Sequence, residues 1–568
     1  MILRTGALDN TGGLLQAAGD LAVDTHGAAL LNSGTGESGG ILAGGDLAVV
    51  SGDLDNRGGL IHAQDDLAVH AGRFDNRNAG LTGSGGHSLL RVDTLDNSGG
   101  TLHAGLGLDA WVKGILTNNG GLISAGELLK LSAAAVLNRD TGAANPATPL
   151  GLQGGQVEIT TGQLDNSAGL IAADERIALT GTAANSSLNN SQGTVSSAGS
   201  LLIETGAITN TGGTLLAATD NRITANSLTG DGRVLSQGDL GLTLKSDFNN
   251  SGEVTANGQA RIETSGQLTN SGSLRAGDLD VHASAITNTA TGEISGGRTR
   301  LTTPGTLTNR GLIDGQQTWI NAGTLNNIGT GRIYGDHIAI AAGNLTNREE
   351  TVGGVISTAT IAARERLDLG VSGTLLNREE ALIFSAGSGS RALNIGGALD
   401  ANGWAIGRAG NVENRSATIE SLGGLSLSAT TLLNVNDHLQ TARCGPSGLP
   451  PSPTSSQRVI TTNTTSAISA GRAGAVLVIT AGRTIPISAN PACWASRRSL
   501  AYAKSSVWLR MTTAAPSCRA RSTRRMIRPG RISRWQHLIR SRSRRAGRIT
   551  RCPSRNPRCN RVPKVPSP

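Results

Sequence analysis

The segment Leu95-Asp96-Asn97-Ser98-Gly99-Gly100 is one copy of a motif that recurs about every 20 residues along most of the chain. Each copy has an aliphatic residue, a polar residue, an asparagine and a Gly-rich step. Other copies read Leu8-Asp9-Asn10-Thr11-Gly12-Gly13 and Ile208-Thr209-Asn210-Thr211-Gly212-Gly213. A fixed period of this length is the signature of repeat architectures. We therefore expect a stack of short units rather than a series of globular domains.

The asparagine of each copy marks an anchor position. Successive anchors are mostly 18 to 24 residues apart, and spacings of 28 and 30 residues after Asn138 and Asn347 indicate insertions. A degenerate copy, Leu228-Thr229-Gly230, lies midway between Asn210 and Asn250. We predict that the structural anchors are Asn10, Asn32, Asn56, Asn76, Asn97, Asn118, Asn166, Asn210, Asn250, Asn270, Asn309 and Asn347, with further copies at Asn138, Asn190, Asn288, Asn327, Asn377, Asn414 and Asn434.

Between anchors, a second pattern predicts strands. It has an aliphatic pair, a small residue, Gly-Asp and then alternating aliphatics, as in Ile41-Leu42-Ala43-Gly44-Gly45-Asp46-Leu47-Ala48-Val49. A period of 2 is the strand signature, and no helical period of 3.6 persists through a repeat. Three short strands per repeat would form one coil of a right-handed parallel β-helix. With ~21 coils at about 4.8 Å each, the predicted rod is roughly 100 Å long.

The composition fits a core of thin aliphatic layers. Aromatic residues are only 2% of the chain, whereas Gly accounts for 79 of 568 residues. Gly supplies the positive φ that corners need, and stacked asparagines can form an amide ladder along the axis. Low-complexity disorder is the alternative interpretation, but disordered chains lack this aliphatic periodicity.

The repeats resemble those of the filamentous haemagglutinin family, which includes the contact-dependent growth-inhibition exoproteins. The matching features are the Leu-Asp/Thr-Asn-x-Gly-Gly anchors, the Ala-Gly-Asp-Leu steps and the segment Leu433-Asn434-Val435-Asn436-Asp437-His438-Leu439. The resemblance covers residues 1–441, about three quarters of the chain. It implies a β-helical fibre that Gram-negative bacteria export by two-partner secretion. Such fibres serve in adhesion or carry a toxic domain to a neighbouring cell.

From this resemblance we expect an adhesive shaft segment of a large secreted surface exoprotein, and not an enzyme. The implied partners are a glycan or protein receptor on a host or neighbouring cell, and an outer-membrane secretion partner. Two alternatives stay open: the delivery stalk of a contact-dependent toxin without its effector, and a polysaccharide-active β-helix enzyme. The segment Val412-Glu413-Asn414-Arg415 is close to the family's Val-Glu-Asn-Asn pretoxin signature but is an ordinary anchor. We expect a fragment whose export signal lies upstream.

Residues 442–568 have a different composition. They contain 25 of the 50 Lys and Arg residues, all five cysteines and 13 of the 16 prolines, but none of the 41 acids. Residues 1–441 therefore carry 25 − 41 = −16, so the overall charge of +9 gives no reason to expect a nucleic-acid partner there. The tail is either a basic nucleic-acid-binding arm or sequence translated out of frame after a frameshift. Its lack of acids and its 23 Arg against 2 Lys favour the frameshift, and we expect disorder.

No catalytic, cofactor-binding or metal-binding residue is predicted. The segment Gly36-Glu37-Ser38-Gly39-Gly40 matches the nucleophile-elbow pattern, but no strand-to-helix context surrounds it. His62 and His103 occupy one repeat position two coils apart, about 10 Å, which is too far to share a metal. Cys552 and Cys559 lack the second pair that a zinc site needs. The Asp residues are spread along the repeats and do not converge on one groove.

Overall fold

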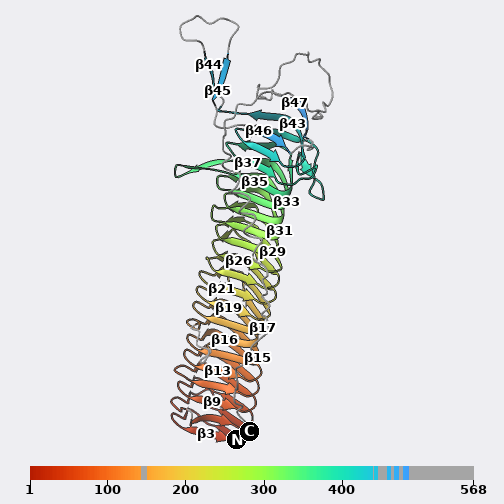
Figure 1. The fold of residues 1–568 in the computed structure, drawn as a ribbon. Helices are drawn as coiled ribbons and strands as arrows, with labels where there is room; N and C mark the ends of the chain where they lie inside the picture. The colour runs from red at the N-terminus through yellow and green to blue at the C-terminus, as the bar shows by residue number, and fades with distance from the viewer. Residues whose placement is uncertain are drawn as a thin grey trace, which may run out of the picture. The chain divides into compact units, whose positions relative to one another are not determined.

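A parallel β-helix of about 21 turns forms the described chain (Figure 1). The computed structural model describes residues 1–36, 38–142, 150–438, 440–444, 457–461, 466–471 and 477–484. Its coils repeat about every 20 residues, so the predicted fold class is confirmed. The described residues include no helix.

Each coil has three strand faces, which we name by their position relative to the anchor. Face A follows the Asn turn and begins with β3 (Leu14–Ala17), β6 (Gly40–Ala43) and β9 (Leu60–Ala63). Face B follows the Gly-Asp corner and begins with β1 (Ile2–Arg4), β4 (Leu21–Asp24) and β7 (Leu47–Val50). Face C leads into the anchor and begins with β2 (Leu8–Asp9), β5 (Leu30–Leu31) and β8 (Leu54–Asp55).

Equivalent residues of successive coils are register partners. Leu21 pairs with Leu47, which pairs with Leu67 of β10 (Leu67–Asp75). On face C, Leu8 pairs with Leu30 and Leu30 with Leu54. Higher in the column a single bent strand runs through all three faces, as in β31 (Glu293–Asn309), β32 (Leu312–Ile328) and β33 (Arg332–Val352).

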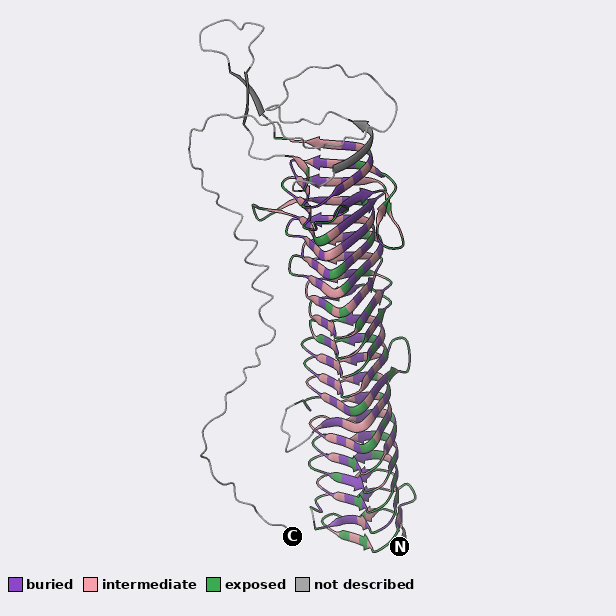
Figure 2. Cartoon of the chain, turned by 45° about the vertical axis from the view of Figure 1, so that its right-hand side comes forward, coloured by how far each residue is buried: buried purple, intermediate pink, exposed green. Residues whose placement is uncertain are grey.

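Alternation along each strand builds the core. β7 is buried at Leu47 and Val49 and exposed at the residues between and after them. Repeated in register, these inward aliphatics form one continuous core, and the buried residues recur as purple segments on coil after coil in Figure 2. The layer is thin, and most of its members are Leu, Ile, Val and Ala. Each coil is therefore stabilised by the coils directly above and below it, as in other repeat proteins.

Insertions leave the column as hairpins. The long spacing after Asn347 holds an antiparallel pair, Glu349–Val352 of β33 with β34 (Val355–Thr358), which projects from the side of the column (Figure 1). A second pair, β39 (Ala398–Leu399) with β40 (Ala405–Ile406), lies in the spacing after Asn377, where sequence analysis identified no insertion. The insertion predicted after Asn138 falls largely on 143–149, outside the described residues; β16 (Gly151–Asp165) follows it.

Parallel pairing continues beyond residue 441. β46 (Ala467–Ala470) pairs with β42 (Thr418–Ser421), and β47 (Leu477–Thr484) pairs with β43 (Leu425–Val435). Two strands from the predicted tail thus stack on the column. The disorder and the frame expected for the remainder of 442–568 concern mostly residues outside the described ones.

Candidate functional site

The predicted anchors are buried inside the column, where they bond to one another. Asn97 Nδ2 donates to Asn118 Oδ1 of the next coil at 2.7 Å, to Gly100 O of its own turn at 3.2 Å and to Leu122 O at 2.9 Å. The same bond joins each anchor to the next from Asn10 to Asn210, and again from Asn250 to Asn434. We name this the asparagine ladder. All of its members except the half-buried Asn434 are buried, so they are not available to a ligand.

Each residue of the anchor motif has a separate physical task. In Leu95-Asp96-Asn97-Ser98-Gly99-Gly100, Leu95 is buried and Asp96 accepts the Ser98 N–H at 3.1 Å. Gly99 has φ +64°, the left-handed region that Gly adopts at no steric cost. A side chain at Gly100 would overlap the Asn97 amide and the backbone of the preceding coil. Gly99 is therefore required for its backbone conformation, and Gly100 is required because there is no room for a side chain.

The ladder is interrupted at the degenerate copy. Thr209 pairs with Thr229, so Gly230 occupies the anchor position above Asn210. Gly230 has φ +103°, and an added Cβ would lie 2.5 Å from Thr211 N. Asn210 Nδ2 keeps the bond to the backbone of the next coil, Arg233 O at 3.2 Å, but has no anchor amide above it. The ladder therefore has two separate runs.

The Gly-Asp corner forms a second column of bonds. Asp20 Oδ1 accepts the Asp46 N–H at 3.1 Å, and Asp46 Oδ1 accepts the Asp66 N–H at 3.1 Å. A side chain at Gly45 would overlap the Asp20 carboxylate. These acids thus hold the corners of successive coils together, which explains the recurring Gly-Asp step in structural terms.

Asp75 binds three arginines on face C. Arg77 Nη2 lies 2.7 Å from Asp75 Oδ2, Arg73 Nη2 lies 2.8 Å away, and Arg57 Nε lies at 3.8 Å. Its side chain is only 6% exposed. Burial alone would raise the pKa of Asp75, but the hydrogen bonds and charge of Arg77, with the charge of Arg73, lower it. The group is a stabilising ionic cluster that links neighbouring coils.

Residues 397–408, which we name the strap, cover part of face B. Asp368 of β35 (Thr360–Val371) is fully buried beneath it and accepts the Ala405 N–H at 2.9 Å. Trp404 lies between Arg366 at 3.7 Å and Arg391 at 4.6 Å from the ring centre. Burial raises the pKa of Asp368. The strap is therefore held by one buried carboxylate and two cation–π contacts.

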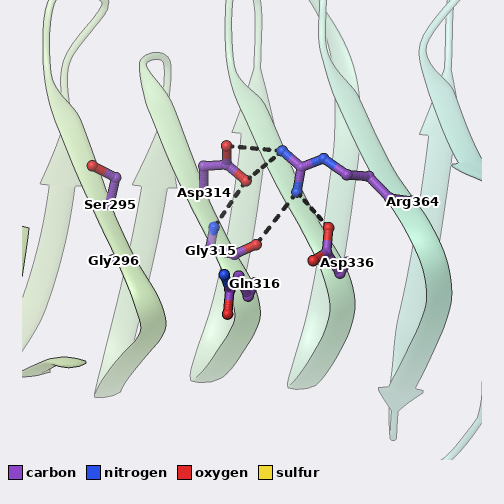
Figure 3. A pocket seen from close by; sticks show the side chains of 7 residues that line it. All are labelled: Ser295, Gly296, Asp314, Gly315, Gln316, Asp336 and Arg364. Atoms are coloured by element: carbon purple, nitrogen blue, oxygen red, sulfur yellow. Dashed lines mark hydrogen bonds and ion pairs between the residues drawn. The ribbon is translucent and has the colours of Figure 1, made fainter. Parts of the chain in front are cut away.

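A polar hollow opens on the outside of the coils where faces A and B meet (Figure 3). Its volume is about 350 Å³, and its lining consists of Ser295, Gly296, Asp314, Gly315, Gln316, Asp336 and Arg364. Arg364 reaches across two coils: Nη2 binds Asp314 Oδ1 and Oδ2 at 3.2 and 3.1 Å, and Nη1 binds Asp336 Oδ1 at 3.0 Å. We name this site the polar hollow.

The polar hollow was not predicted from the sequence. Arg364 lies 50 residues from Asp314 and 28 from Asp336, and no local motif joins them. Only the register could have indicated the polar hollow. When the anchors are aligned, Ser295 pairs with Asp314 and Gly296 pairs with Gly315 on adjacent coils. The expectation that the acids do not converge holds for the Gly-Asp corners but not for these two carboxylates.

The residues considered for chemistry stay apart in the structure. His62 and His103 are exposed on face A, and each pairs in register with Gly83 of the coil between them. Ser38 lies in a turn before β6 with no helix after it. Cys552 and Cys559 lie outside the described residues. Within the described ranges, no three His, Cys, Asp or Glu side chains gather where they could hold a metal ion.

A comparison with protein families identifies the repeat. The haemagglutinin repeat model matches residues 3–58, 32–105, 107–168, 154–230, 220–272 and 275–349, which together make up more than half of the chain. The chain belongs to the haemagglutinin repeat family. No curated protein and no solved structure matches it.

Membership of the haemagglutinin repeat family confirms the resemblance seen in the anchors. The chain is a haemagglutinin-repeat β-helix segment consistent with a filamentous haemagglutinin-type exoprotein, and the family implies a secreted bacterial protein that is typically not an enzyme. The part of the chain that the structure describes contains no helix with the length and apolarity needed to cross a membrane.

Proposed function

We propose that this haemagglutinin-repeat chain is an adhesive shaft segment of a large exoprotein on the surface of a Gram-negative bacterium. The observation that carries the proposal is the stack itself. The asparagine ladder and the in-register faces bury the repeated residues, so side chains that differ between coils are left outside. A chain built this way positions many surface contacts along one stiff support.

The expected partners follow from this role. A glycan or protein on a host or neighbouring cell would bind the outer side chains, and an outer-membrane transporter would export the full-length protein. The polar hollow and the strap supply local surface features that the plain coils lack.

The second candidate is the delivery stalk of a contact-dependent toxin. The same stack supports it, because a stalk must also be long and resistant to unfolding. A third candidate, a polysaccharide-active β-helix, gains one feature from the structure: Asp314 and Asp336 lie at one hollow. Arg364 holds both carboxylates, so a hydrolytic pair would require its displacement. Release of reducing ends from a panel of acidic and neutral polysaccharides would favour this third candidate.

Gene deletion distinguishes adhesion from delivery. A strain without the gene is compared with its parent for attachment to epithelial and bacterial cells, and for inhibition of sibling cells in co-culture. Lost attachment with unchanged inhibition supports the adhesive shaft. Lost inhibition supports the delivery stalk, and no change in either assay contradicts both. Deletion of the secretion transporter should remove the protein from the cell surface.

A further inference from the structure

The lining of the polar hollow excludes several classes of ligand. It presents two carboxylates, one guanidinium, one amide and one hydroxyl, with no apolar side chain. An apolar ligand would displace water from Gln316 and the other lining groups without replacing its hydrogen bonds, which is unfavourable. The formal charge of Asp314, Asp336 and Arg364 is 1 − 2 = −1. That charge disfavours phosphate, sulfate and carboxylate groups.

Metal cations fit the polar hollow poorly as well. Arg364 already binds both carboxylates, at 3.1 Å from Asp314 Oδ2 and 3.0 Å from Asp336 Oδ1. Calcium usually takes six to eight oxygen ligands. The hollow offers only two acids, and within the described residues no three His, Cys, Asp or Glu side chains gather where they could hold a metal ion. A cation would have to displace Arg364 and then find further ligands.

The remaining polar groups suit a ligand that both donates and accepts hydrogen bonds. Ser295 donates its hydroxyl proton to Glu293 Oε1 at 3.0 Å, so its oxygen is an acceptor toward the hollow. Gln316 is exposed, and its amide has no hydrogen-bond partner among the described residues, so it offers a donor and an acceptor. Carboxylate oxygens accept O–H groups strongly. Adjacent hydroxyl groups of a sugar ring provide this combination.

We propose that the polar hollow binds one uncharged pyranose unit of a glycan, with Asp336 and Ser295 accepting its hydroxyl protons and Gln316 and Arg364 donating to its oxygens. The volume of about 350 Å³ lies at the lower end of the range for small-molecule sites, which fits one ring rather than a long oligosaccharide. The hollow is open along the surface, so the rest of the glycan extends into solvent.

As a receptor contact, the polar hollow rests on the adhesive function proposed above. A single open polar site binds weakly, and a surface densely covered with such chains gains avidity by engaging many glycans at once. Sugar binding by the purified chain and adhesion by the whole bacterium are therefore separate measurements that can fail independently.

The test detects binding of methyl pyranosides to the full chain by saturation-transfer NMR. The neutral probes are methyl glycosides of glucose, galactose, mannose and N-acetylglucosamine, and the charged probes are methyl glucuronide and glucosamine. The blocking variant is S295W, which places a bulky side chain on the lining. The control variant is S196W, because Ser196 occupies the same face A position five coils below, on β19 (Thr194–Ser197). Circular dichroism and thermal unfolding establish that both variants fold.

We expect at least one neutral probe to give saturation transfer with the wild-type chain and with S196W. The signal should fall at least tenfold in S295W and several-fold in Q316A. No transfer from any neutral probe, transfer from charged probes only, or an unchanged signal in S295W would overturn the proposal. If S295W abolishes sugar binding but the bacteria do not adhere, the result supports the polar hollow as a sugar site and contradicts the adhesive function. If the bacteria adhere but the chain binds no sugar, the result supports the adhesive function and contradicts the sugar site.

Discussion

Asn118 Nδ2 donates to Asn138 Oδ1 at 2.9 Å, although 20 residues separate the two side chains. Both are fully buried, and Asn118 also bonds to Gly121 O at 3.1 Å. Chains of buried hydrogen bonds polarise one another, and a missing member leaves its neighbours unsatisfied in a low-dielectric interior. The stability of a coil therefore depends on an asparagine that belongs to the next one.

We expect N118A to lower the free energy of unfolding by about 2–3 kcal/mol, because it leaves the Asn97 amide short of a partner and opens a small cavity. The matched control is N119A, at the adjacent asparagine, whose half-buried side chain accepts the Arg139 N–H at 3.2 Å. N119A should change stability by no more than about 0.5 kcal/mol. Urea denaturation measures both, and equal effects would contradict a special role for the ladder.

Substitution of Gly230 should not restore the asparagine ladder at its interruption. We expect G230A to destabilise the column by more than about 3 kcal/mol, because a Cβ would overlap Thr211 N in addition to straining φ. The control G212A also has a positive φ, +62°, but its Cβ would contact only Gln192 Cγ at 3.7 Å. It should cost about 1–2 kcal/mol. G230N should likewise fail to join the two runs of the ladder, and a stabilised G230N would show that this account of the gap is wrong.

The Asp75 cluster makes a pH-dependent contribution. Its folded-state pKa is lowered, so the contribution is present at neutral pH and is lost as the pH falls below about 4. We expect D75N to cost about 1 kcal/mol at pH 7, after allowing for the solvent exposure of the arginines. The difference between D75N and wild type should shrink toward pH 3. D93N is the control, since Asp93 and Lys113 form an exposed pair at 3.8 Å.

The stability of the strap should depend on pH in the opposite sense to that of the Asp75 cluster. Burial raises the folded-state pKa of Asp368, so the folded state binds the proton more tightly and stability falls as pH rises from about 4 through that pKa. Hydrogen exchange, corrected for its intrinsic pH dependence, should show residues 397–408 becoming less protected over this range. D368N keeps an acceptor for Ala405 N–H and should abolish the trend. Peptides from the 349–358 hairpin provide the internal control, and identical trends in both segments would rule out Asp368 as the cause.

Sequence was sufficient for the coils because every requirement of the motif is local or periodic. Asn97 and Gly99 reveal their roles through residue type and spacing alone, whereas the close approach that requires Gly100 appears only when the coils are stacked. The polar hollow was not predictable because Arg364 meets Asp314 only after three coils are stacked. The strap was missed although the spacing from Asn377 to Asn414 is 37 residues, since the length of an insertion does not show where it folds back. Asp368 accepts the Ala405 N–H there, although the two residues are 37 positions apart in the sequence.

Neighbouring ladder members are separated by as few as 18 and as many as 37 residues, yet their amide bonds all measure 2.7–2.9 Å. The pitch of the column is thus independent of the contour length of any one turn. Extra residues are tolerated wherever they loop outward, whereas loss of one residue inside a face would move its aliphatic side chains to the wrong side. Such a scaffold can exchange its outward segments while its interior stays constant, and the same freedom makes those outward loops the natural positions for grafting foreign epitopes.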